Sequence, residues 1–318
     1  MLSGPHAFTL RQLQYIVSVA DELSFRRAAA RCRVSQPSLS SQIAQVEEVL
    51  GVRLFERSHK QVIVSTVGRD LVARARRLLR DADEIQWAGQ RAADPLSGTL
   101  RLGILATVSP YLLPAVTLPL RKELARLRIE WIEDKTEPLV QRLADGEIEG
   151  AIVALEADIG DVERQVIAKD PFFLVTRPEH PLATSTDRVS AAELRDQELL
   201  LLDDGHCFRE QALEVCSRAG ATQSEFRATS LSTLIHMIAG GGGATLIPAL
   251  AIDAEVRRAR LHVRPLAIPF AQRTIGLIWR KSSPEVTLRA VCTTIRASYP
   301  HSPRIWGADR ARRKGAIS

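Results

Sequence analysis

The first 65 residues carry apolar side chains at helical spacing in three short runs. A hydroxyl residue that can cap a helix precedes each run: Thr9, Ser24 and Ser35. The third run has Pro37 in its first turn, where the missing N–H costs nothing, and Gly51 at its end. The pattern therefore predicts three helices, the third one ending at Gly51.

The third helix has two unlike faces. Its apolar side chains share one face and should pack inward: Leu39, Ile43, Val46 and Leu50. The opposite face is small and polar, with almost no charge: Pro37, Ser38, Ser40, Ser41, Ala44 and Gln45. A solvated helix face usually carries lysine and glutamate, so these short side chains favour close approach to base edges in a DNA major groove. Two helices joined by a tight turn, the second with such a face, predict a helix-turn-helix.

After Gly51 the sequence predicts a β-hairpin, the wing of a winged helix-turn-helix. Its strands cover residues 54–57 and 61–64, with a turn between them. Basic side chains of the hairpin would face DNA phosphates: Arg53, Arg57, His59 and Lys60. The alternative is a basic hairpin that faces only solvent.

Residues 66–92 predict one long helix. Alternating steps of four and three residues connect a seam of apolar and small side chains: Leu71, Ala75, Leu78, Ala82, Ile85 and Gly89. Because so long a helix needs a partner, the seam favours dimerisation over packing on its own chain. The segment Asp-Pro-Leu-Ser-Gly at 94–98 then predicts a hinge.

Charge is unevenly distributed along the 318 residues. Residues 1–80 hold 13 basic and 6 acidic side chains, a net charge of +7, and the remainder holds 30 basic and 31 acidic ones. A basic N-terminal module indicates a nucleic-acid partner. The longest apolar stretch, 238–252, contains four glycines and a proline and is too short to span a bilayer. We therefore expect a cytoplasmic protein with no membrane partner.

Beyond the hinge, predicted strands and helices alternate. Strands at 100–105, 128–132 and 151–155 enclose helices at 109–125 and 137–145, which predicts an α/β fold with a mostly parallel sheet. Two more strands, at 163–168 and 172–175, lead to a second α/β lobe. The expected organisation is a winged helix-turn-helix (1–66), a dimerising linker helix and hinge (67–97), a two-lobed regulatory domain like a periplasmic binding protein (98–302), and a basic tail without a fold (303–318).

Two of the four cysteines lie on one predicted helix. An apolar strand at 198–202 leads through Asp-Asp-Gly to a helix at 208–219, so Cys207 lies at its first turn, where orphan N–H groups and the helix dipole favour a thiolate. Cys216 is nine residues further on, on the opposite face and about 13 Å along the axis. A disulfide needs Cα atoms within about 7 Å. The pair can therefore bond only if the helix unwinds, which favours a redox switch; the alternative is two core thiols.

Polar residues from both lobes are expected to meet near Cys207. Thr107 and Thr136 follow the first two strands of one lobe, and His206 follows a strand of the other, so all three face the crevice beyond the strand ends. Each threonine taken alone is more often just a helix cap. No cofactor and no metal are expected, because two cysteines nine residues apart with one local histidine do not match common zinc ligand spacings.

Several N-terminal motifs resemble one family. Residues 28–30 (AAA), 34–40 (VSQPSLS), 50–57 (LGVRLFER) and 66–68 (TVG) are similar to the DNA-binding module of LysR-type transcriptional regulators. The resemblance implies double-stranded promoter DNA as a partner, and a homodimer or homotetramer assembled through the linker helix. It also implies that these residues lie at the groove: Gln36, Pro37, Ser38, Ser40 and Ser41.

The regulatory region resembles the peroxide-sensing branch of the same family. The similarity runs through residues 103–114, Asp-Gly-His-Cys at 204–207, Cys216, and residues 226–231 and 273–277. It implies that Cys207 is the peroxidatic thiol and Cys216 the resolving one. Thr107, Thr136 and His206 would orient hydrogen peroxide, the effector, and Arg273 would lie near the thiol. The resemblance also implies that the protein is a regulator of antioxidant genes, as an activator or a repressor, and that it is not an enzyme. RNA polymerase would be a further partner.

Two other functions compete with this interpretation. A regulator gated by an organic metabolite in the inter-lobe cleft would be stabilised by that ligand and indifferent to peroxide. A thiol peroxidase would consume peroxide continuously, and the basic helix-turn-helix argues against it.

Overall fold

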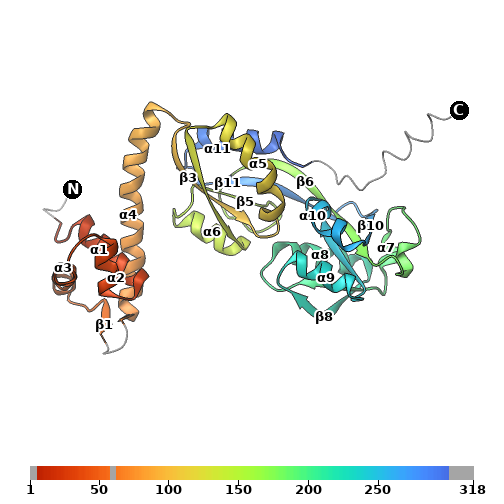
Figure 1. Ribbon diagram of the computed structural model, residues 1–318, viewed down its shortest axis with the longest axis horizontal. Helices are drawn as coiled ribbons and strands as arrows, with labels where there is room; N and C mark the ends of the chain where they lie inside the picture. Colours follow the sequence, from red (N-terminus) through yellow and green to blue (C-terminus); the bar gives the residue numbers. More distant parts are fainter. Residues whose placement is uncertain (1–5, 58–61, 301–318) are drawn as a thin grey trace. The chain divides into compact units, whose positions relative to one another are not determined.

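The computed structural model describes residues 6–57 and 62–300, with all their side chains except those of residues 57, 84, 86–88, 90–93, 257 and 258. The chain divides into two compact units, Met1–Ala93 and Asp94–Ser318 (Figure 1). The predicted hairpin turn, with His59 and Lys60, and the tail at 303–318 lie outside the described residues, as does the side chain of Arg57.

The N-terminal unit contains the three predicted helices, α1 (Leu10–Glu22), α2 (Phe25–Arg31) and α3 (Gln36–Leu50). The three predicted caps are confirmed, since each hydroxyl accepts a hydrogen bond from a backbone N–H of the first turn: Thr9, Ser24 and Ser35. Gly51 ends α3 with φ of +67°, a conformation that glycine adopts without strain. The predicted inward face of α3 is confirmed by the full burial of Leu39, Ile43 and Val46, while Leu50 is half-buried.

Strands β1 (Phe55–Arg57) and β2 (Val62–Val64) form the antiparallel wing, and α4 (Thr66–Ala93) follows. The start of α4 packs on the N-terminal core through Val72 and Ala75. Further along the seam, Leu78 is 47% exposed and Ile85 is 76% exposed. Leu78 and Ile85 are thus large apolar side chains that the described part of the chain leaves exposed. A helix that pairs with another copy would have such side chains.

The C-terminal unit is built on one nine-stranded sheet, with two lobes of different hydrophobic core. The strand order is β4-β3-β5-β11-β6-β9-β7-β8, and β10 pairs with β6. The first lobe has β3 (Gly98–Leu105) parallel to β4 (Leu127–Asp134) and β5 (Gly150–Ala154), with helices α5 (Ser109–Glu123), α6 (Thr136–Ala144) and α11 (Glu285–Ala297). The second lobe has β7 (Glu198–Leu202) parallel to β8 (Thr222–Ala228) and β9 (Ala244–Pro248), with α8 (Cys207–Ala219) and α9 (Leu231–Ala239). The predicted α/β class with a mainly parallel core is confirmed in both lobes.

Long antiparallel strands join the lobes. The prediction of two strands at 163–168 and 172–175 was wrong, because β6 (Glu163–Thr176) runs without a break. Its partner β11 (Gln272–Trp279) pairs along the first part of β6, with Gln272 opposite Pro171, and β9 pairs along the rest. Asp170, which suggests a surface turn in the sequence, is buried and faces Arg273 across the pair. The gap between the two predicted strands, residues 169–171, therefore lies inside one continuous strand.

Several short elements were not anticipated: a 3-10 turn (Pro181–Ala183), α7 (Ala191–Leu194), α10 (Ala249–Ala259) and β10 (His262–Pro265). Cys292 is fully buried in the core of the first lobe. Among the helices of the described chain, none combines the length and apolar character needed to cross a bilayer.

Candidate functional site

Helix α8 begins at the thiol. Strand β7 ends at Leu202, and four residues lead into α8, whose first residue is Cys207. Gly205 adopts φ of +85°, and a Cβ there would lie 3.2 Å from the Cδ and Nζ atoms of Lys135. The positive φ favours glycine in this turn, and a larger residue would also have to displace the Lys135 side chain. Among the described residues, no side chain caps α8, so its first N–H groups and the positive end of the helix dipole lie near the sulfur.

The two thiols of α8 lie in different cores. Cys207 is 7% exposed and packs in the core of the first lobe, whereas Cys216 is 3% exposed and packs in the core of the second. All four cysteines are free. With about 1.5 Å of rise per residue, nine residues of intact helix separate the two positions by about 13 Å along the axis. The structure is therefore that of the dithiol, with the helix holding the sulfurs apart.

A pocket of about 510 Å³ between the lobes gives access to Cys207. The start of α6 lines it with Thr136 and Glu137, the loop after β5 with Ala157, and the start of α8 with Gly205 and Cys207. The Thr136 hydroxyl is buried and has no hydrogen-bond partner in the described part of the chain. Thr136 and Cys207 thus line one pocket, and a buried hydroxyl without a partner is a group that a small polar molecule could satisfy.

His206 does not line this pocket. Its ring is buried, and its Nε2 lies 3.2 Å from the carboxylate Oδ1 of Asp203. Burial lowers the pKa of His206, and the charge of Lys135 lowers it further, against the opposing effects of Asp203 and a backbone hydrogen bond to Thr229. The ring is thus neutral at neutral pH and fixes the turn before Cys207.

Asp204 fastens the start of α8 to its surroundings. Its carboxylate accepts hydrogen bonds from Arg209 Nε at 2.9 Å and from Arg227 Nη1 at 2.8 Å. The Arg209 hydrogen bond, with the charges of Arg209, Arg227 and Lys135, lowers the pKa of Asp204. From the first lobe, Lys135 Nζ donates to the Asp204 carbonyl at 2.7 Å and lies 3.8 Å from the carboxylate of Asp203. The turn before the thiol is therefore connected to both lobes.

Arg273 lies beneath the second residue of α8. It is fully buried, with Nε 3.0 Å and Nη2 2.9 Å from the same carboxylate oxygen of Asp170. Its Nη1 donates to the Thr107 hydroxyl at 2.8 Å, which leaves the hydroxyl hydrogen of Thr107 free to donate elsewhere. The guanidinium carbon is 5.6 Å from the ring centroid of Phe208. Burial raises the pKa of the Asp170 carboxyl, and the charge of Arg273 opposes that shift.

The structure therefore does not bring all the predicted peroxide residues into one pocket, and His206 lies apart beside Asp203. Thr136 and Cys207 share a pocket, whereas Thr107 and Arg273 share a buried hydrogen bond next to Phe208. Neither Thr107 nor Arg273 is among the residues that line the Cys207 pocket.

The predicted groove-facing residues of α3 lie on the surface. Exposed side chains among them are Gln36, Pro37, Ser38, Ser41 and Gln45, and Ser40 is half-buried. Arg53, just before the wing, is exposed. This face carries hydrogen-bonding groups on a rigid helix, as reading of base edges requires.

Comparison with known proteins identifies the family. Residues 10–69 match the bacterial regulatory helix-turn-helix of the lysR family, and residues 93–299 match the LysR substrate binding domain. The chain belongs to the LysR family of transcriptional regulators. It is 39% identical over 276 residues to the DNA-binding transcriptional dual regulator OxyR of Escherichia coli K12, covering 86% of this chain and 90% of that protein.

Solved structures agree with this assignment. A full-length OxyR variant from Pseudomonas aeruginosa is 34% identical and superimposes with a TM-score of 0.72 over 92% of this chain and 99% of its own. A hydrogen-peroxide-bound OxyR mutant from Corynebacterium glutamicum is 32% identical, with a TM-score of 0.63 over 93% of this chain and 94% of its own. Within the LysR family the chain is thus a relative of the OxyR proteins.

Sequence reasoning missed Lys135, Asp204 and Asp170 as parts of the site. Lys135 directly precedes the predicted Thr136, and Asp204 lies in the turn before Cys207. Their nearness in the sequence to predicted site residues was the signal that could have identified them. Asp170 carried no such signal, because its partner Arg273 is 103 residues away.

Proposed function

We propose that the chain is a hydrogen-peroxide-sensing transcriptional regulator of antioxidant genes, switched by a reversible disulfide between Cys207 and Cys216. The observation that carries this proposal is the placement of both thiols on one helix, each in the core of a different lobe. Joining them requires rearrangement of both cores, which converts one chemical event into a change of shape. Relatives named as hydrogen peroxide-inducible genes activators, such as that of Pectobacterium carotovorum, support peroxide as the effector.

The first step is oxidation of Cys207 by peroxide. The thiolate attacks one oxygen, the O–O bond breaks, and the other oxygen leaves as hydroxide, which takes up one proton to become water; Cys207 becomes a sulfenic acid. The unpaired Thr136 hydroxyl can hold the peroxide beside the sulfur. The N-terminus of α8 stabilises the negative charge of the attacking thiolate.

The second step is condensation with Cys216. Burial raises the pKa of Cys216 to about 11, so it remains a poor nucleophile while α8 is wound. Unwinding exposes its thiol to water and returns its pKa towards the ordinary value. Its sulfur then attacks the sulfenic sulfur of Cys207, a disulfide forms, and the sulfenic oxygen leaves as water.

Transmission to DNA requires a partner subunit. We infer a homodimer or homotetramer in which the exposed part of the α4 seam, including Leu78 and Ile85, packs against another copy. The α3 face would then read promoter DNA in the cytoplasm, and a changed packing of the regulatory lobes would alter how the protein engages DNA and RNA polymerase. The coarser conclusion, a DNA-binding regulator, follows from the family.

The test is a count of free thiols and the intact mass after one equivalent of peroxide. Wild type should fall from four free thiols to two, with Cys207 and Cys216 joined. Cys207→Ser should be inert, and Cys216→Ser should hold a sulfenic acid that a dimedone reagent captures. Cys292→Ser is the matched control for a buried thiol outside α8 and should behave as wild type at the switch. A Cys207→Ser protein that still responds to peroxide contradicts the proposal, and a metabolite-gated regulator would show no thiol loss at all.

A further inference from the structure

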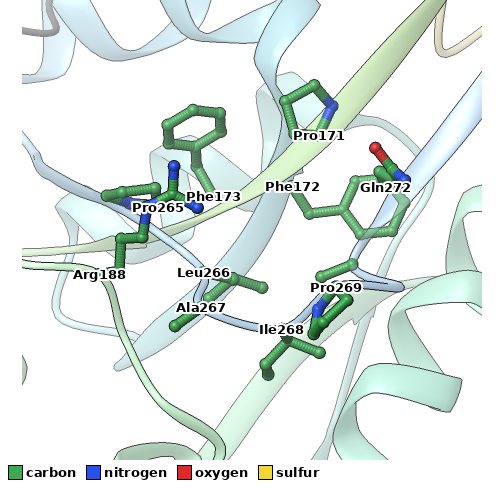
Figure 2. A pocket seen from close by; sticks show the side chains of 11 residues that line it. Pro171, Phe172, Phe173, Arg188, Pro265, Leu266, Ala267, Ile268, Pro269 and Gln272 are labelled. Atoms are coloured by element: carbon green, nitrogen blue, oxygen red, sulfur yellow. The ribbon is translucent and has the colours of Figure 1, made fainter.

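A second pocket lies on the second lobe, away from Cys207. It has a volume of about 380 Å³ and lies between β6 and the segment at 265–272 that joins β10 to β11 (Figure 2). Nine of its eleven lining residues are apolar, and the two polar ones are Arg188 and Gln272. Within the described part of the chain, no acidic side chain lines this pocket.

The cation of this pocket, Arg188, lies at the end of an exposed loop, and the next residue is hydrogen-bonded to the pocket wall. The exposed Arg188 guanidinium forms no ion pair with any residue that the structure describes. The next residue, Val189, bridges to the pocket wall: its N–H donates to the Pro265 carbonyl at 2.8 Å, and its carbonyl accepts from Ala267 at 2.7 Å. Figure 2 shows Arg188 and Gln272 at opposite sides of the pocket, with apolar side chains between them.

We infer that this pocket is a second ligand site, which binds a small carboxylate with an apolar body, such as an aryl acid or a medium-chain fatty acid. The carboxylate would form a bidentate ion pair with Arg188, the geometry that guanidinium groups favour. The apolar body would displace water from Phe173, Leu266 and Ile268. The size of the pocket suits a ligand of this kind, because small-molecule sites span about 300–1,000 Å³.

The walls of the pocket rest on helix α8. Phe172 of the lining meets the Phe208 ring edge-to-face, with centroids 5.0 Å apart and planes at 87°. Within the same wall segment, the Phe270 ring lies 4.3 Å beneath the guanidinium carbon of Arg218, near the end of α8. The pocket has this shape while α8 is wound. A bound carboxylate therefore favours the dithiol state and slows disulfide formation, a coupling that rests on the proposed function.

The binding test uses reduced full-length protein, titrated by calorimetry with phenylacetate and with octanoate. Both acids should bind saturably, and their neutral amides should bind at least about tenfold more weakly, because they lose the charged hydrogen bonds. Arg188→Gln should lose at least about tenfold in affinity, and Ala267→Leu should occlude the pocket. The matched control is Arg195→Gln, an exposed arginine of the same lobe outside the pocket, which should bind as wild type. Absence of saturable binding, or full binding by Arg188→Gln, overturns the site.

The coupling test measures disulfide formation with saturating phenylacetate. The rate should fall several-fold in wild type and in Arg195→Gln and should be unchanged in Arg188→Gln. An equal affinity for the reduced and oxidised protein overturns the coupling. If peroxide forms no disulfide in any variant, the proposed function fails, whereas the titration of reduced protein still decides whether the pocket binds carboxylates.

Discussion

Replacing Phe208 by leucine should speed the formation of the disulfide between Cys207 and Cys216. The ring packs edge-to-face on Phe172 at 5.0 Å and lies 5.6 Å from the Arg273 guanidinium carbon. The aromatic pair contributes about 0.5–1.5 kcal/mol beyond area burial. A cation–π contact contributes about 0.5–1 kcal/mol at exposed sites and more where both partners are buried, as Arg273 and Phe208 are. Leucine keeps most of the apolar burial. The replacement should therefore destabilise the wound helix, relative to the unwound one, by at least about 1–2 kcal/mol, which corresponds to a rate of disulfide formation at least about 5 times faster.

The assay isolates the second chemical step. Excess peroxide converts Cys207 rapidly to the sulfenic acid, and timed alkylation of remaining thiols then follows the loss of Cys216. Phe25→Leu is the matched control, because it removes a similar edge-to-face pair with Phe55 at 5.9 Å in the N-terminal unit. That variant should close the disulfide at the wild-type rate. If Phe208→Leu also forms the disulfide at the wild-type rate although its α8 is destabilised, unwinding of α8 does not limit disulfide formation and the reasoning is refuted.

Four further outcomes follow from the same structure. Thr136→Val removes the unpaired hydroxyl and should slow the reaction of Cys207 with peroxide at least about tenfold, as loss of a positioned polar group does. Thr136→Ser keeps a hydroxyl and should retain most of the wild-type rate in stopped-flow measurements. In the folded protein the pKa of His206 lies below its ordinary value of 6.5, so the unfolded chain takes up the proton first when the pH drops below 6.5. The free energy of unfolding should therefore decrease as the pH is lowered through this range. Denaturant titrations should show a weaker pH dependence for His206→Gln. Asp170→Asn leaves Arg273 buried without its carboxylate and should cost about 3–5 kcal/mol in denaturant unfolding, and a cost under 1 kcal/mol would show that the pair matters little. Reduced and oxidised protein should both bind promoter DNA with an affinity that falls steeply as salt rises, and a flat salt profile in gel-shift titrations would contradict phosphate contact by the basic module.

Features determined by neighbouring residues could be predicted from the sequence. The caps at Thr9, Ser24 and Ser35 lie next to the helices they begin, and Gly51 ends α3 where its flexibility is needed. The start of α8 and the separation of its thiols follow from helix geometry alone. Local signals of this kind need no knowledge of the tertiary structure.

Features determined by distant residues could not be predicted. The continuity of β6 depends on its pairing with β9, which lies about seventy residues further along the chain, and with β11, which lies about a hundred residues further along. This continuous strand was therefore predicted as two strands, with residues 169–171 left between them. The contact of Lys135 with the turn before Cys207 crosses between the lobes, 69 residues apart, and nothing in either segment identifies the other. The unpaired state of the Thr136 hydroxyl likewise depends on tertiary packing.

The most direct test of the account is hydrogen exchange of the α8 amides before and after one equivalent of peroxide, with the disulfide mapped in the same sample. The account predicts protected amides through Cys207–Ala219 in the dithiol form. It predicts fast exchange in that segment once Cys207 and Cys216 are joined. A mapped disulfide between these two residues with the protection of α8 unchanged would contradict the claim that the helix must unwind.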